Sequence, residues 1–331
     1  MASNPVIAGN VLAAGLNDRW KATYEGALAS YPWLDKIMDR TPTSDKRTET
    51  YAYFKSAPQL ERKPDGQAIA SENFDADSYS VSNFEVEKRI PWRIKDRQDD
   101  QTKSLMTHVE MLARDAATYD ARIAGQMLSA GTDIALLESV PNAPDGGAIF
   151  ATTAGGAARF GVTDGNLLTG SGVSNPDQIT TDMFAVIAQY QLMQDTKGRR
   201  LWNDLVLSGE YFVLYAPSAA NSLNFTKAFK QMIVASTAGA AGAGVSNPIT
   251  ATGLNITPMP FFYYSGGDWT VHLADAPIKA LFKQTRIPFY TTYSVEENSD
   301  EARNEGVEAF YVKGRLGYGA NLAASAVKVN N

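Results

Sequence analysis

Cysteine is absent from this chain of 331 residues. Disulfide bonds, thiolate metal sites and cysteine nucleophiles are therefore excluded, and the composition suits a reducing cytoplasm. No apolar run approaches the roughly 18 residues that a membrane span requires. The first residues, "MASNPVIAGNVLAAGLNDRW", lack the basic start and apolar centre of a signal peptide. We therefore expect no association with a membrane.

Positive charge is also in short supply. The chain has 30 Lys and Arg against 36 Asp and Glu, a formal net charge of −6. A dedicated nucleic-acid-binding protein usually presents a basic face, so this balance disfavours that class. With 44% hydrophobic and 20% charged residues, the composition is typical of a globular protein. The length fits one large domain or two moderate ones.

Motifs of catalysis are missing as well. His108 lies in a helical stretch and His272 in a strand-like one, and neither is accompanied by a nucleophile motif such as Gly-x-Ser-x-Gly. The glycine-rich residues 239–246 lack the Gly-Lys-Ser/Thr ending of a phosphate-binding loop. Residues 169–176 contain two glycines, and we do not expect them to join a strand to a helix. The sequence therefore predicts no catalytic residue and no cofactor site.

Acidic residues cluster near the C-terminus, and their spacing does not match a calcium-binding loop. They are Glu296, Glu297, Asp300, Glu301 and Glu305. We interpret them as a solvated loop. Asp99 and Asp100 fit the first turn of a helix, where the helix dipole favours anions. No metal site is predicted.

Basic residues occur in three short segments, 61–63, 88–97 and 197–200. The second, "KRIPWRIKDR", interleaves charged residues with Ile90, Trp92 and Ile94. Such a strand can contact nucleic-acid phosphates or acidic groups on a neighbouring subunit. Its alternation of charged and apolar residues favours the second.

The stretch from Thr48 to Ile90 predicts a hairpin. "TETYAYFKSA" and "DSYSVSNFEVEKRI" both alternate as strands do, and Pro-Asp-Gly at 64–66 is a turn signal. We expect Tyr79, Val81, Asn83, Glu85 and Glu87 on one face, opposite Phe84 and Val86. An isolated two-stranded hairpin is marginal in water. The hairpin must therefore lie on another surface, and a second copy of the chain is the natural candidate.

Helices are predicted on both sides of this hairpin. Residues 16–39 form a helical region that Pro32 breaks, and 99–130 form a long helix of about 48 Å at ~1.5 Å per residue. Its apolar stripe is Leu105, Val109, Leu112, Ala116, Tyr119, Ile123 and Met127. A helix near 180–195 is expected to be capped by Thr181 or Asp182. Residues 140–178 are expected to be mostly loops, and 307–319 and 320–329 to form a final strand pair.

The order of these parts resembles tailed-phage major capsid proteins of the HK97 fold, most closely the Mu-like major head subunit group. The similar segments are "YAYFKSAPQLERKPDGQAIASENF" with "YSVSNFEVEKRIPWRIKDRQDDQ", "PDGGAIFATTAGGAARFGVTDGNLLTGSG", "DAPIKALFKQTRIPFYTTY" and "VEAFYVKGRLGYGANLAAS". They extend over nearly the whole chain. None is a catalytic signature, so the resemblance rests on their order.

The resemblance implies an α+β fold with a particular division of the chain. Residues 1–42 would form an N-terminal arm, 43–97 an extended loop, 98–179 a peripheral domain with a spine helix, 180–275 an axial domain, and 276–331 the return to the peripheral domain. It also implies hexamers and pentamers of an icosahedral shell around double-stranded DNA, which the shell would contact weakly and without specificity. Portal and scaffold proteins, with or without a decoration protein, would be partners. The protein would be made in the host cytoplasm and end in the virion.

This resemblance suggests which residues of the hairpin arm contact neighbouring subunits. They are Phe54, Arg62, Lys63, Asp65, Phe84, Val86, Arg89, Trp92 and Arg93. Two alternatives stay open. One is an encapsulin-like nanocompartment shell, which packages enzymes, and the other is a carbohydrate- or nucleotide-acting enzyme with an unusual site.

Overall fold

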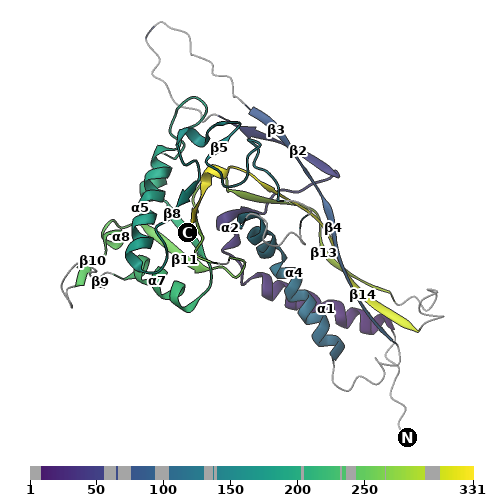
Figure 1. The fold of residues 1–331 in the computed structure, drawn as a ribbon. Helices are drawn as coiled ribbons and strands as arrows, with labels where there is room; N and C mark the ends of the chain where they lie inside the picture. The colour runs from purple at the N-terminus through teal and green to yellow at the C-terminus, as the bar shows by residue number, and fades with distance from the viewer. Residues whose placement is uncertain are drawn as a thin grey trace.

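The computed structural model describes residues 9–55, 65, 76–93, 104–129, 137, 140–202, 205–231, 233–235, 244–264, 266–294 and 306–331. These residues form a mixed α+β structure, as predicted (Figure 1). It contains two larger sheets, one in a rounded body and one in an elongated ribbon.

The body is built on a five-stranded sheet, here called the body sheet. Its order is β11 (Asn255–Pro260), β8 (Glu210–Tyr215), β12 (Trp269–Leu273), β15 (Ala326–Asn330) and β7 (Leu167–Thr169). Side chains alternate along a strand, so β8 sends Tyr211, Val213 and Tyr215 to one face and Phe212 and Leu214 to the other. All five of these residues are buried, so the body sheet needs a cover on both faces.

Helices supply both covers. α5 (Pro176–Leu192) and α7 (Ala219–Lys230) pack on one face. The C-terminal half of α4 (Ser104–Leu128) and the short α2 (Leu34–Ile37) pack on the other. The remaining short elements are β5 (Thr153–Ala154), β6 (Ala157–Ala158), η2 (Arg159–Gly161), α6 (Leu205–Ser208), β9 (Ile233–Ala235), β10 (Gly244–Ser246), α8 (Pro248–Ala251) and η3 (Ala323–Ser325).

The ribbon sheet has four strands in the order β1 (Met38–Asp39), β13 (Leu281–Ser294), β14 (Val307–Ala320) and β4 (Phe84–Arg93). It extends away from the body, and α4 and α1 (Gly9–Leu28) lie side by side along it (Figure 1). The apolar stripe predicted for the long helix faces this sheet. Leu16, Trp20, Val109, Phe310 and Val312 are buried together between the two helices and β14.

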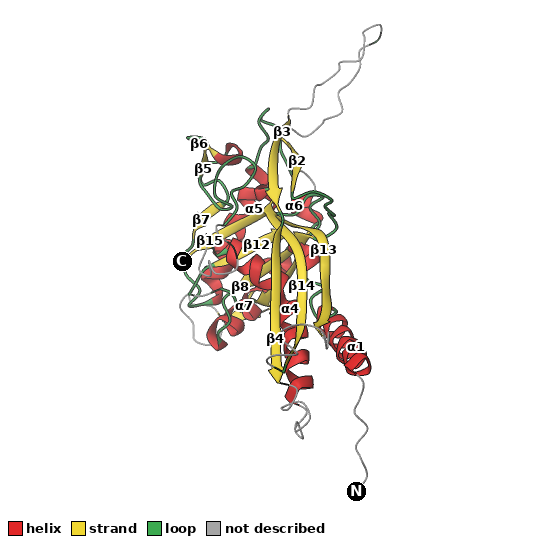
Figure 2. Ribbon diagram, turned by 90° about the vertical axis from the view of Figure 1, so that its right-hand side faces the viewer, coloured by secondary structure: helices red, strands yellow, loops and turns green. Residues whose placement is uncertain are grey.

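The predicted hairpin is present. β2 (Thr48–Phe54) pairs antiparallel with β3 (Ala76–Ser82), from Thr48 opposite Ser82 to Phe54 opposite Ala76. β3 and β4 then follow one another nearly in line (Figure 2). Of the connection between β2 and β3, the structure describes Lys55 and the exposed turn residue Asp65.

The start of α5 differs from the prediction. The helix begins at Pro176, and its cap is Asn175, whose side chain accepts a hydrogen bond from the Gln178 backbone N–H at 3.0 Å. The Gln178 side chain in turn accepts from the Asn175 backbone N–H at 3.3 Å, which completes a capping box. Thr181 and Asp182 were therefore wrong as caps. Asp182 accepts a hydrogen bond from the Ser171 hydroxyl at 2.7 Å instead.

Two further expectations are corrected. Residues 169–176 do join a strand, β7, to a helix, α5, although Asn175 already occupies the capping position. The last two strands do not pair with each other, because β14 lies between β13 and β4 while β15 joins the body sheet. Pairing of this kind depends on long-range packing, which local patterns do not report.

Candidate assembly surfaces

An aromatic contact holds the β2–β3 hairpin on the ribbon sheet. The ring of Phe282 on β13 lies 5.1 Å from the ring of Tyr51 and 5.9 Å from that of Tyr79, centroid to centroid. Both contacts are edge-to-face, an arrangement that aromatic rings favour. The two tyrosines lie opposite each other in the hairpin, so one ring on the ribbon sheet contacts both strands.

A buried hydrogen-bond network lies beside this contact. Gln284, which is fully buried, accepts from the Tyr51 hydroxyl at 2.7 Å and donates to the Asn83 side-chain oxygen at 2.9 Å. Asn83 donates in turn to Ser44 Oγ and the Lys46 carbonyl, both at 2.7 Å. Buried polar groups are costly unless paired, so this network specifies one orientation of the hairpin. We call these contacts, with Phe282, the hairpin anchor.

Two glycines on β14 make room for the hairpin anchor. A Cβ added at Gly319 would lie 2.4 Å from the Phe282 ring, and one at Gly317 would lie 2.6 Å from Gln284 Nε2. Real Cβ atoms do not approach other atoms this closely. The alternating glycines of "GRLGYG" are the sequence signal for this site, since glycine inside a strand marks a close approach.

A second contact braces the hairpin near its far end. The backbone N–H and the hydroxyl of Thr196 both donate to the Lys55 carbonyl, at 3.2 and 3.1 Å. Thr196 lies in the turn after α5, so this contact joins the hairpin to the body. The opposite side of the hairpin is exposed and bears hydroxyl pairs, Thr48 with Ser82 and Thr50 with Ser80. That side is the part of the hairpin available to another molecule.

Asn83 divides the predicted second strand in two. Before it, the odd-numbered Tyr79 and Val81 point toward the interior of the chain, while after it the even-numbered Phe84 and Val86 do so. The expectation that Val81 and Asn83 share a face with Glu85 and Glu87 was therefore wrong. Phe84 and Val86 pack on the chain's own core, with the Phe84 ring 6.0 Å from that of Tyr318.

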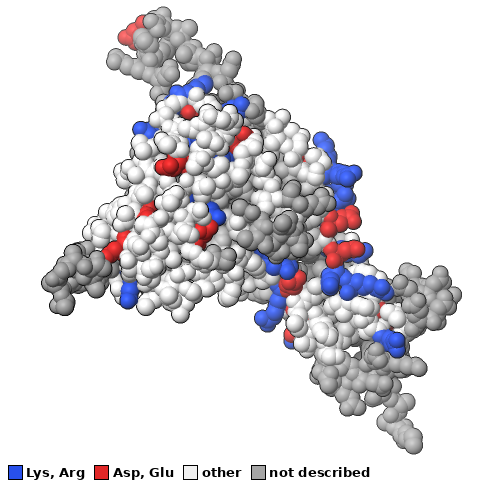
Figure 3. Space-filling view, in the orientation of Figure 1, with Lys and Arg blue, Asp and Glu red and all other residues white. Residues whose placement is uncertain are grey.

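The outer face of the ribbon sheet has charged residues of both signs. Glu85 lies 3.8 Å from Arg315, Glu87 lies 3.5 Å from Lys313, and the Arg89 guanidinium lies 5.9 Å from the centre of the Tyr311 ring. Figure 3 shows positive and negative side chains interspersed along this edge, while the body is mostly uncharged. No described element covers this face.

The remaining predicted contact residues are placed as follows. Trp92 is half-buried and donates its indole N–H to Glu308 at 3.1 Å. Arg93 is exposed at the end of β4, opposite Val307. Arg62, Lys63 and the side chain of Phe54 lie outside the described residues. Contacts between subunits stay a prediction for all of them.

A groove of about 740 Å³ lies between β4 and α4. Val86, Ile90, Leu112, Ala116 and Val312 are among its apolar lining, and Lys88, His108 and Asp115 also line it. Met111 beside it is 62% exposed. Since β4 is the last strand of the ribbon sheet, the groove runs along an open sheet edge. His108 thus lies on an exposed surface of α4.

A buried carboxylate on α4 links this helix to the ribbon sheet. Asp120 on α4 accepts from the Tyr318 hydroxyl at 2.7 Å and from Lys283 at 2.8 Å, which joins the helix to β14 and β13. Burial and the Asp120 carboxylate raise the pKa of Tyr318 well above its ordinary value.

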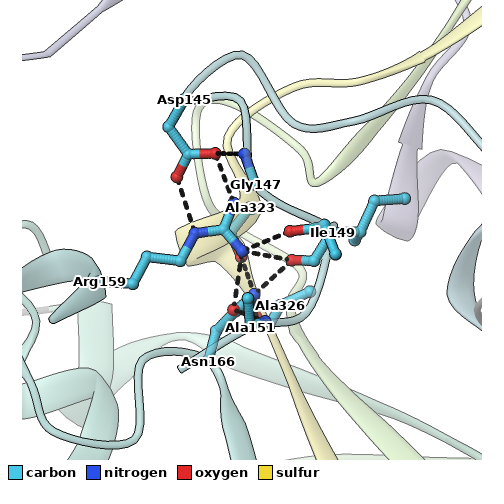
Figure 4. A network of polar contacts seen from close by, with 9 residues as sticks. Asp145, Gly147, Ile149, Ala151, Arg159, Asn166, Ala323 and Ala326 are labelled. Carbon is cyan, nitrogen blue, oxygen red and sulfur yellow. Dashed lines mark hydrogen bonds and ion pairs between the residues drawn. The ribbon is translucent and has the colours of Figure 1, made fainter. Parts of the chain in front are cut away.

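Arg159 is the centre of a second polar network (Figure 4). Its guanidinium donates to both Asp145 oxygens, at 2.7 and 2.8 Å, and to the carbonyls of Ala148 and Ile149. Asn166 beside it donates to the carbonyls of Ile149, Ala323 and Ala326. The Arg159 side chain is 1% exposed, and a charge so buried is stable only when paired in this way. These contacts explain Arg159 as a structural residue.

His272 lies inside the body sheet. Its Nε2 is 3.0 Å from the Thr270 hydroxyl, which is 2.9 Å from the hydroxyl of Tyr264. Burial, with a smaller effect of Lys279, lowers the pKa of His272 to about 3, so the imidazole is neutral at pH 7. Among the described residues, no three His, Asp or Glu side chains are grouped to hold a metal ion. No helix in the described part of the chain is long and apolar enough to cross a membrane.

No family model and no curated protein matches this sequence. Solved structures do match. The procapsid of bacteriophage JBD30 has 16% identity and a TM-score of 0.50 over 98% of this chain and 76% of that one. The mature capsid of bacteriophage PhiM1 has 10% identity and a TM-score of 0.52 over 89% and 85%. The capsid of Myoviridae phage XM1 has 9% identity and a TM-score of 0.52 over 90% of each chain. The chain therefore has the HK97-like fold of phage capsid proteins.

Proposed function

We propose that this chain is a major capsid protein that assembles with itself into hexamers and pentamers of an icosahedral phage head around double-stranded DNA. The observation that supports this most is the fold, shared with several phage capsid chains over about nine-tenths of the sequence. The role would be structural rather than enzymatic, and the protein would be a component of the virion.

The surfaces described above suit such a role. The hairpin is held firmly on one side and exposes the other, and the ribbon sheet leaves its outer face and its β4 edge open within the described residues. Open strand edges and uncovered faces are liabilities in a monomer, because they invite pairing with other chains. In a shell, neighbouring subunits would cover them.

Finer parts of the proposal follow the resemblance to the Mu-like major head subunit group. Residues 43–97 would be the extended loop, 98–179 and 276–331 the peripheral domain, 180–275 the axial domain and 1–42 the arm. Arg89, Trp92 and Arg93 are exposed or half-buried and are the described residues best placed to contact a neighbour. Portal and scaffold proteins would be partners during assembly, and the DNA would be held by weak contacts.

Negative-stain electron microscopy of the protein expressed alone tests the proposal. The informative variant replaces residues 56–75 by Asn-Gly, which retains the hairpin up to the pair Phe54–Ala76. A matched control replaces the same residues by a Gly/Ser linker of equal length. We expect closed shells or capsomers from the wild type and none from either variant. Monomers from the wild type would contradict the proposal.

The contents of the shells distinguish the encapsulin-like alternative. Shells made in the presence of portal and packaging proteins should contain DNA that a nuclease cannot reach. A co-purifying enzyme inside shells without DNA would favour a nanocompartment instead.

A further inference from the structure

β4 forms an open edge of the ribbon sheet with an apolar groove beside it. It is the last strand of that sheet, and β14 is its one neighbour among the described strands. The groove of about 740 Å³ between β4 and α4 is lined by Val86, Ile90 and Leu112, among others. Met111, which also lines it, is 62% exposed. An open strand edge beside apolar side chains is a surface on which a further strand can pair.

The sequence of β4 has a two-fold pattern about Lys88. In "FEVEKRIPW", residues 84–92, apolar residues stand two and four positions from Lys88 on either side. Glu87 and Arg89 flank it with opposite charges. Two copies of such a strand can pair antiparallel about a two-fold axis that passes between their Lys88 residues. This pairing places Glu87 of each copy opposite Arg89 of the other.

The same pairing matches the apolar residues of the two copies. Opposite residues of an antiparallel pair lie on the same face of the sheet, so Val86 would lie opposite Ile90, and Phe84 opposite Trp92. All four are half-buried in the single chain. Because the axis is perpendicular to the sheet, α4 of both copies lies on the same side and the two grooves face each other. Met111 would then lie between the two helices.

The charges also disfavour the neighbouring registers. Moving the axis by one residue in either direction places Glu87 opposite Glu87 or Arg89 opposite Arg89, and like charges directly opposite each other destabilise a strand pair. In the register centred on Lys88, like charges are opposite at Lys88 itself, which lines the groove together with Asp115. Pro91 has no N–H to donate, but it lies near the end of the paired stretch.

Contacts within the chain already hold the two complementary charges in place. Glu87 lies 3.5 Å from Lys313, and the Arg89 guanidinium lies 5.9 Å from the centre of the Tyr311 ring. Lys313 and Tyr311 belong to β14, on the side of β4 away from the open edge. A carboxylate can accept several hydrogen bonds, so Glu87 can contact a second cation without giving up Lys313.

We propose that two copies of the chain join through β4, with Glu87 of each opposite Arg89 of the other, so that the two ribbon sheets become one. The same patch is used on both copies, so the contact is isologous and closes after two subunits. A hexamer or pentamer needs a heterologous contact instead. The β4 pair would therefore join neighbouring capsomers, and this placement rests on the proposed function.

The absence of cysteine makes the register of this pair measurable. In Lys88→Cys, an exposed position, the two introduced thiols would face each other, with Cα atoms about 4.5–5.5 Å apart, within disulfide range. Mild oxidation should yield disulfide-linked dimers on a non-reducing gel. Glu85→Cys is the matched control on the same strand. Glu85 would lie opposite Pro91, so its two thiols would be about 20 Å apart at ~3.4 Å per residue, and dimers should form at least about tenfold more slowly.

Charge reversal tests the complementarity at protein concentrations below those of shell assembly. Glu87→Arg or Arg89→Glu alone places like charges opposite each other twice, and each should raise the concentration at half-dimerisation about tenfold. The two changes together restore opposite charges and should restore dimerisation. Glu25→Arg, at an exposed site on α1, makes the same change in net charge as Glu87→Arg and should dimerise as the wild type does. Analytical ultracentrifugation measures all four variants.

The results separate the β4 pair from the proposed function. Equal cross-linking of Lys88→Cys and Glu85→Cys, or no linked dimer from either, would overturn the pairing. Charge variants that dimerise alike, singly and combined, would also overturn it. If the wild type still forms shells in these cases, the proposed function stands. A wild type that forms β4-linked dimers and no shells would support the pairing and overturn the proposed function. Thermal unfolding of each purified variant confirms that it is folded.

Discussion

The body sheet and the ribbon sheet are made of similar strands but are covered differently. Every residue of β12 is buried, because helices pack on both faces of the body sheet. In β4, half-buried and exposed residues largely alternate, because α4 and α1 cover one face only. The body can therefore be stable as a monomer, while the ribbon keeps a face and an edge for contacts outside the chain.

The two regions also differ in what fixes their geometry. Aromatic and aliphatic packing dominates the body, as in the stacked rings of Tyr215 and Phe225, 4.2 Å apart. At the hairpin, orientation depends on directional hydrogen bonds around Gln284 and Asn83. Apolar packing contributes most to stability, whereas directional bonds contribute specificity. The two regions should therefore respond differently to mutation.

Truncating the body core should have the largest effect. Phe225 is fully buried and contacts the rings of both Tyr215 and Trp269. Phe225→Ala should lower the free energy of unfolding by about 3–5 kcal/mol, as core truncations do. Ile90→Ala in the half-buried inner face of β4 should cost about 1–2 kcal/mol. Urea unfolding of the unassembled protein measures the free energy of unfolding of both variants. Equal losses would contradict the difference between the body and the ribbon.

Crowding the hairpin anchor should have an intermediate effect. In Gly319→Ala the new methyl group would collide with the Phe282 ring, and overpacking of this kind costs about 1–3 kcal/mol. Hydrogen exchange should speed up at the amides of β2 and β3 while those of β8 and β12 stay protected. Gly26→Ala is the control, since a Cβ there meets nothing within 4 Å. Equally faster exchange at the amides of β8 and β12 would mean that the hairpin anchor stabilises the whole chain and not the hairpin alone.

Acid should destabilise the body through His272. Its pKa is lowered to about 3 in the folded chain, from 6.5, so between these values the unfolded chain binds a proton that the folded chain does not. Stability therefore falls as the pH drops from 6.5 towards 3, by up to about 1.4 kcal/mol per pH unit. His272→Gln lacks this response. Urea unfolding at pH 7 and pH 5 measures the free energy of unfolding of both proteins. If wild type and variant differed by the same amount at both pH values, His272 would not be the cause of the acid response.

The smallest effect on a single chain is expected at the outer face of the ribbon. Glu87 is exposed and pairs with Lys313 at 3.5 Å. Glu87→Gln should change the free energy of unfolding by no more than about 0.5 kcal/mol, because surface ion pairs contribute little. A larger effect on assembly than on unfolding would identify this face as an interface. A loss of several kcal/mol in the monomer would contradict the view that the face is solvated.

Periodic features were predictable from the sequence. The helix at 104–128 follows from its apolar stripe, and the hairpin from the alternation on both sides of Pro-Asp-Gly. The cap of α5 was also readable, since Asn175-Pro176 followed by Gln178 has the pattern of a capping box. It was missed because Thr181 and Asp182 are equally common caps nearby.

Long-range features were not predictable in the same way. The change of face at Asn83 leaves a trace in the sequence, two adjacent polar residues at Ser82 and Asn83. Its cause, the hydrogen bonds that Asn83 makes with Ser44 and Gln284, does not. The pairing of β15 with β12 joins segments that are distant in the sequence, with Trp269 opposite Val329 and His272 opposite Ala326. Nothing in the sequence around Asp120 indicates its partners, Lys283 and Tyr318, which come from β13 and β14. Contacts of this kind depend on the complete fold and not on the residues nearby in the sequence.

The two hydrogen bonds from Thr196 to the Lys55 carbonyl have a consequence for motion. The hairpin is held at two separate places, by the hairpin anchor and by this contact with the turn after α5. Releasing this contact would cost about 2 kcal/mol, at about 1 kcal/mol for each bond, so the released form would be populated at about 3%. A neighbour that binds this form better could select it, and one chain could thereby fit both the flatter and the more curved parts of a closed surface.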